Sequence, residues 1–148
     1  MNKQRIYASL LILGASILLF RTIRLLTVEN GWEVLTNWVI ALTFIEMAID
    51  ISCIVFALPW LIKNSKGSRS ISLRLGATAA IFHAFRVLIY VLGKTGPWIN
   101  FDVKPQYRSS HEVDTVWVYV AAILAVMGII GVMVIWILIK RSNKENTG

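Results

Sequence analysis

The chain has 148 residues, 57% of them hydrophobic, and its mean hydropathy is +0.68. A soluble domain is about 45–50% apolar, so this composition excludes an ordinary soluble domain. The formal net charge of +7 does not indicate nucleic-acid binding, because no predicted helix combines a basic face with interleaved aromatic residues. We therefore expect the lipid bilayer, and no nucleic acid, as a partner.

Four apolar blocks follow one another along the chain, at residues 6–28, 34–62, 71–92 and 113–139. A helix needs about 20 apolar residues to cross a hydrocarbon core of about 30 Å. The first block resembles a signal peptide, but its length and the lack of a cleavage site predict an uncleaved span. The sequence therefore predicts an all-α fold, an antiparallel bundle of four transmembrane helices in a single domain of residues 1–148.

Basic residues are distributed unequally between the two ends of these spans. Nine lie in the N-terminal tail, the second loop with its flanks and the C-terminal tail, and five lie at the opposite ends. The positive-inside rule then predicts cytoplasmic termini in a multi-pass protein of the plasma membrane. Aromatic residues are expected at the outer membrane surface (Trp32, Trp38, Tyr90, Trp98, Trp117 and Tyr119) and at the inner one (Tyr7, Trp60 and Trp136).

The second block contains two acids, Glu46 and Asp50, which lie on one helix face because they are four residues apart. Steps of three and four extend this face into a small and polar stripe of Thr36, Thr43, Glu46, Asp50, Cys53 and Ala57. Such a stripe is expected to face other helices or water rather than lipid. Cys53 is the only cysteine, so an intramolecular disulfide is excluded and a small buried side chain is expected.

The third block contains a basic counterpart, His83 and Arg86, on a face that also carries Gly76, Ala79 and Tyr90. Asp50 and His83 are each 12 residues from the cytoplasmic ends of their spans, and Glu46 and Arg86 are 16 and 15 residues away. One charge at the bilayer centre costs roughly 2.5–3.5 kcal/mol, so burial favours pairing. The sequence therefore predicts contacts between Asp50 and His83 and between Glu46 and Arg86.

The first block ends with two arginines, Arg21 and Arg24. Either both extend to the outer membrane surface along their apolar stems, or one of them faces Glu46 from above. The fourth block has no charge, and its small residues Ala125, Gly128 and Gly131 predict close packing against another helix. A homo-oligomer through this face remains an open alternative.

Acid, histidine and arginine side chains inside a membrane are typical of ion pathways and proton relays, and histidine changes charge near physiological pH. The favoured hypothesis is a small transporter, or a permeation or ligand-binding protein, for an ion, a proton or a small charged solute. The binding or relay residues would be Glu46, Asp50, His83 and Arg86, with Arg21, Arg24 and Tyr90 as possible additional members.

The main alternative is an accessory, structural or immunity-type subunit of a larger membrane complex. The charges would then be a packing lock, and the third loop, with Trp98, Phe101 and Tyr107, would contact the partner.

An intramembrane enzyme is less favoured, and we expect no catalytic residues, no metal and no cofactor. Metals accept carboxylate and imidazole ligands, but the fourth span adds none to those of the second and third. His111 lies in or beside the third loop, where it is badly placed as a second haem ligand, and Ser52 lies off the face of Asp50. The first span also lacks the acid of small multidrug exporters, and no family resemblance is evident.

Overall fold

The computed structural model describes residues 3–95, 100–108 and 115–144. Its helices are α1 (Lys3–Thr27), α2 (Gly31–Val34), α3 (Asn37–Lys63), α4 (Lys66–Thr95), the 3-10 helix η1 (Pro105–Tyr107) and α5 (Thr115–Lys144). The described chain contains no strand beyond one isolated bridge between Leu35 and Val103, so the all-α prediction is confirmed. By length and composition α1, α3 and α4 can cross a membrane. The fourth span and the orientation of the termini stay predictions.

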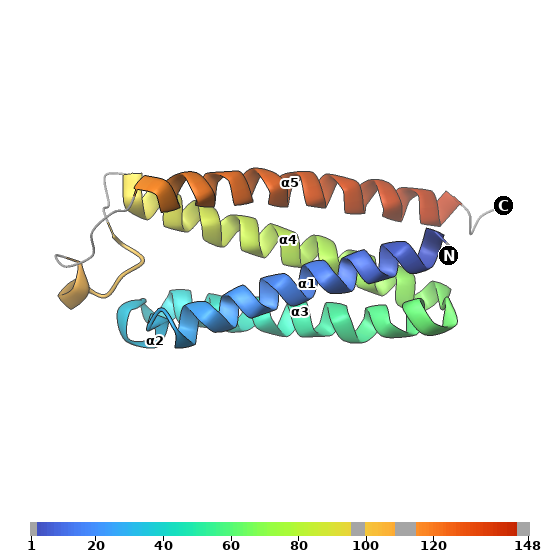
Figure 1. Ribbon diagram of the computed structural model, residues 1–148, viewed down its shortest axis with the longest axis horizontal. Coiled ribbons are helices and arrows are strands. Elements are labelled where there is room, and N and C mark those ends of the chain that lie inside the picture. Colours follow the sequence, from blue (N-terminus) through green and yellow to red (C-terminus); the bar gives the residue numbers. More distant parts are fainter. Residues whose placement is uncertain (1–2, 96–99, 109–114, 145–148) are drawn as a thin grey trace.

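The four long helices run lengthwise beside one another (Figure 1). Helix α4 packs against both α3 and α5, whereas α1 packs mainly against α3. The beginning of α1 and the end of α5 lie at one end of the bundle, and α2 lies at the other (Figure 1). Helices α3 and α4 therefore form the centre of the bundle, and α1 and α5 flank it.

The second connection is much shorter than the predicted loop of residues 63–70, because only Asn64 and Ser65 separate α3 from α4. Asn64 has a left-handed backbone (φ 51°), and its N–H donates to the carbonyl of Trp60 at 3.0 Å. Asparagine tolerates this conformation at a helix end. The hydroxyl of Ser65 accepts the N–H of Ser68 at 3.4 Å, as a helix-capping serine does. Arg69 is consequently a buried residue of α4 rather than a loop residue.

At the α2 end of the bundle, the third connection folds back onto the start of α3. The N–H and the hydroxyl of Thr36 both donate to the carbonyl of Asp102, at 3.0 and 3.1 Å. The ring of Phe101 stacks on Trp38 with centroids 6.1 Å apart. Phe101, which was predicted to contact a partner, is thus engaged within its own chain. Trp98 lies outside the described residues.

At the opposite end, Trp60 is 1% exposed and packs with Ala8 and Leu73 in a small hydrophobic core. Its predicted place in the aromatic belt facing the membrane surface is therefore wrong. The small side chain of Ala8 lets α1 approach closely enough for the indole to fill the space between helices. Trp136, by contrast, is exposed as a belt residue should be. The side chain of Trp117 lies outside the described part.

Candidate functional site

The polar stripe of α3 points into the bundle. Its members Thr43, Glu46, Asp50, Cys53 and Ala57 are all buried, with no exposed surface. Thr36 caps the start of α3 and is partly exposed. The prediction that this face points away from lipid is confirmed for the stripe within α3.

Both predicted charge pairs are present between α3 and α4. His83 Nε2 lies 2.9 Å from Asp50 Oδ2, and Arg86 Nε lies 2.6 Å from Glu46 Oε2. The second contact lacks the alignment of a hydrogen bond, so it is an electrostatic contact. These four residues are called the ion-pair cluster below. Matched depth in two antiparallel helices predicted the pairing correctly, whereas a role for the cluster in binding or relay stays a prediction.

His83 is the centre of the ion-pair cluster because its ring touches the other three members. Beyond Asp50, its Nδ1 lies 3.3 Å from Arg86 Nη2 and 3.7 Å from Glu46 Oε2. A guanidinium only donates hydrogen bonds, so Nδ1 accepts from Arg86 in the neutral ring. Nε2 then carries the proton and donates to Asp50. The hydrogen bonds thus define one tautomer of His83.

The two carboxylates are incompletely satisfied. Both carboxylate oxygens of Glu46 and Oδ1 of Asp50 are buried and have no hydrogen-bond partner among the described residues. Buried polar atoms normally have partners, and exceptions concentrate where a structure does chemistry or binds something. Each carboxylate therefore retains at least one oxygen that can take up a proton or accept a hydrogen bond.

Sequence reasoning missed Thr22, which α1 contributes to the ion-pair cluster. Its side chain is fully buried, and its hydroxyl lies 3.4 Å from Arg86 Nη2, from which it accepts, while it donates to the carbonyl of Leu18. The available signal was the seven-residue spacing of the small residues Ala8, Ala15 and Thr22, all of which are buried. That spacing keeps one face of α1 toward its neighbours.

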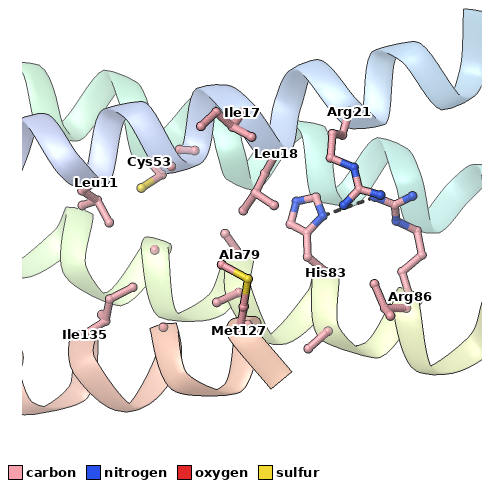
Figure 2. A pocket seen from close by; sticks show the side chains of 18 of the residues that line it. Leu11, Ile17, Leu18, Arg21, Cys53, Ala79, His83, Arg86, Met127 and Ile135 are labelled. Atoms are coloured by element: carbon pink, nitrogen blue, oxygen red, sulfur yellow. Dashed lines mark hydrogen bonds between the residues drawn. The ribbon is translucent and has the colours of Figure 1, made fainter. Parts of the chain in front are cut away.

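Arg21 and Arg24 of α1 point in different directions. Arg24 lies 3.7 Å from Glu29 in an exposed ion pair, so the structure does not bring it to the cluster. Arg21 extends toward His83 and Arg86 (Figure 2). It thus approaches the cluster beside Arg86 rather than facing Glu46. Within the described chain, Arg21 has no hydrogen bond and no ion pair.

A groove of about 930 Å³ lies along the bundle between α1, α4 and α5. His83, Arg86 and Arg21 line it at one level, and Tyr90 and Asp102 line it nearer the third connection. Figure 2 shows Leu18 and Arg21 entering from α1 and Met127 from α5. Glu46 and Asp50 lie behind His83 and Arg86, away from the groove. The basic half of the cluster therefore borders the groove, and the acidic half is shielded from it.

Two further polar residues of α3, Ser52 and Cys53, are engaged with backbone carbonyls. In the described part of the chain, no group of three or more His, Cys, Asp or Glu side chains is placed to hold a metal ion. The hydroxyl of Ser52 donates to the carbonyl of Ala48 at 2.7 Å, so it is engaged on its own helix. Cys53 is buried, with its sulfur 3.6 Å from the carbonyl of Ser72. His111 lies outside the described residues.

Fold and site together define an all-helical protein with three helices long and apolar enough to cross a membrane, in which a buried acid–histidine–arginine cluster borders a largely apolar groove. Comparisons with protein-family models, with curated proteins and with solved structures gave no match.

Proposed function

We propose that this chain is a four-span protein of the cell membrane, with both termini in the cytoplasm, that binds or transports a small charged solute in exchange with a proton. Helix α5 supports the fourth span, because it is 30 residues long and its first charged residue is Lys140. An even number of spans agrees with the start of α1 and the end of α5 lying at one end of the bundle (Figure 1).

Cysteine labelling in intact cells tests this orientation. With Cys53 replaced by serine, single cysteines are introduced at Gln106, in the third connection, and at Lys66, at the start of α4; both positions are exposed. A membrane-impermeant maleimide should label the cysteine at Gln106 and reach that at Lys66 only after the cells are opened. Labelling in the reverse order would contradict the orientation.

The observation that carries the function is the position of His83. Its ring borders the groove and also contacts both buried carboxylates. Among the described residues, it is therefore the one titratable group through which a proton can pass between the groove and these carboxylates. A proton that arrives at Nδ1 removes the acceptor of Arg86 Nη2 and favours an ion pair with Glu46, 3.7 Å away. Arg86 then turns toward the groove, where it can bind an anionic group.

The second candidate is a packing lock in an accessory subunit, and the close pairing of all four charges favours it. Paired charges can specify how helices pack without adding stability. A lock, however, requires no proton exchange, and it gives no role to the carboxylate oxygens that lack partners.

Infrared difference spectroscopy of the protein in lipid vesicles separates the two candidates without knowledge of the solute. Lowering the pH from about 8 to about 5 spans the range in which histidine ordinarily changes charge. We expect a carboxyl band and an imidazole band to change together. Glu46→Gln or Asp50→Asn should each remove part of the carboxyl signal, and Glu33→Gln, at an exposed position of α2, should not alter the bands of the cluster. A signal unaffected by the two cluster substitutions would support the lock.

A further inference from the structure

The groove is apolar over most of its length; Arg21, His83 and Arg86 line it at one level, while Asp102 and Arg141 line its two ends. Leu11, Gly76 and Ile135 line it on the side of Tyr7, which α1 places 14 residues from Arg21. At 1.5 Å per residue, this distance is about 21 Å. The volume of about 930 Å³ lies within the range of about 300–1,000 Å³ that is usual for ligand pockets. The groove therefore has the dimensions of a site for one elongated, largely apolar molecule.

Two glycines leave this part of the groove open. A Cβ atom added at Gly14 of α1, or at Gly131 of α5, would meet no atom within 4 Å. By contrast, a Cβ atom at Gly76 of α4 would lie 2.6 Å from the side chain of Leu11. The space thus lies between α1 and α5, where a chain-like ligand can lie along both helices.

The charged level of the groove has more positive than negative charge. Arg21 and Arg86 both line it, and Arg86 Nε is occupied by Glu46 from behind. Arg21 has no ion pair in the described chain, and its guanidinium points toward that of Arg86 (Figure 2), so two like charges meet at this level. A carboxylate or phosphate between two guanidinium groups relieves this repulsion and accepts several charge-assisted hydrogen bonds.

The geometry points to an anionic amphiphile as the ligand, an acyl chain with a carboxylate or phosphate headgroup. The headgroup lies between Arg21 and Arg86, and the acyl chain follows the apolar walls past Gly14 and Gly131. An acyl chain that runs from the headgroup toward the third connection is disfavoured, because the carboxylate of Asp102 lines that end of the groove. This inference names the solute class for the site proposed above and in that sense rests on the proposed function.

Native mass spectrometry of the full chain released from detergent tests the inference with three single-chain probes, palmitate, oleoyl lysophosphatidic acid and uncharged hexadecanol. We expect one anionic molecule per chain, and binding of hexadecanol weaker by about tenfold or more. Arg21→Gln should weaken anion binding to a similar degree. Arg24→Gln, in the exposed ion pair on the same helix, is the matched control and should bind as wild type does.

Two further variants test the path of the acyl chain. Gly131→Leu and Gly14→Leu place a side chain in open space of the groove and should abolish binding. Gly67→Leu should not, because Gly67 lies outside the groove, although a Cβ atom added there also meets no atom within 4 Å. Circular dichroism confirms that each variant is folded. Binding of palmitate alone or of lysophosphatidic acid alone supports the inference and identifies the headgroup. Equal binding of hexadecanol, or full binding by Arg21→Gln, overturns it.

The two proposals can fail separately. If the anions bind as expected but the infrared spectrum shows no proton exchange at the cluster, the proposed function fails and the groove site stands. If protons exchange but the groove shows no preference for an anionic headgroup, the inference fails and the proposed function stands.

Discussion

Arg86→Gln should lower the free energy of unfolding by about 3–5 kcal/mol, because removal of one partner of a buried ion pair leaves the other charge without compensation. Glu46 has no exposed surface, and Arg86 Nε at 2.6 Å is its nearest cation. The substitution also removes the donor to Thr22 and to His83 Nδ1. Thermal unfolding in mild detergent measures the loss.

The double variant Glu46→Gln/Arg86→Gln is compared with Arg86→Gln. Because it removes both charges, it should recover most of the stability that the single substitution loses. Arg24→Gln is the control for loss of an exposed arginine, and it should change stability by less than about 0.5 kcal/mol. A double variant that is folded and yet shows no proton exchange would support a functional cluster. A double variant as unstable as Arg86→Gln alone would show that the two charges do not compensate each other.

Trp60→Ala should also cost about 3–5 kcal/mol, the usual effect of deleting a buried tryptophan. Trp60 is 1% exposed and packs on Ala8 of α1 and Leu73 of α4. Helices inside a membrane associate through close packing rather than through exclusion of water. The cavity left by the indole would therefore loosen the contact of α1 with its neighbours.

Trp136→Ala is the matched control for this substitution, because Trp136 is 64% exposed. Its loss should change the thermal unfolding temperature little, whereas Trp60→Ala should lower it by several degrees or more. Equal effects of the two substitutions would contradict the burial of Trp60 in the core.

The charge pairing of α3 with α4 was predictable because two rules act together. The helical period puts Glu46 and Asp50 on one face of α3, and it puts His83 and Arg86 on one face of α4. The membrane then relates depth to residue number in each helix, so equal depth identifies the partners. The short connection of Asn64 and Ser65 preserves this relation by keeping α3 and α4 antiparallel neighbours.

The contribution of α1 was harder to predict, because its rotation about its own axis depends on packing rather than on charge. The positions of Arg21 and Arg24 in the sequence do not indicate which of them turns inward. The spacing of small residues that includes Thr22 is not specific either, because such residues also occur in helices for other reasons. Trp60 was misplaced for a related reason, since an aromatic residue near a helix end suits both a membrane surface and a protein core.

The groove could not be predicted from the sequence. It exists because α1 and α5 both pack on the central helices without filling the space between them. A sequence pattern can indicate a contact between helices, but it does not indicate a gap between them. Gly14 and Gly131 are consistent with the open space, but glycines in a membrane helix more often permit close approach.

Nitrogen NMR of the His83 ring measures whether this side chain joins the buried acids to the groove as its hydrogen bonds require. The chain has two histidines, so protein labelled with ¹⁵N-histidine gives two sets of ring signals, which His111→Gln assigns. Nε2 of His83 should carry the proton donated to Asp50 and Nδ1 should be an acceptor, and Arg86→Gln, which removes the donor to Nδ1, should change the Nδ1 signal. A wild-type ring protonated at Nδ1 alone would contradict this arrangement.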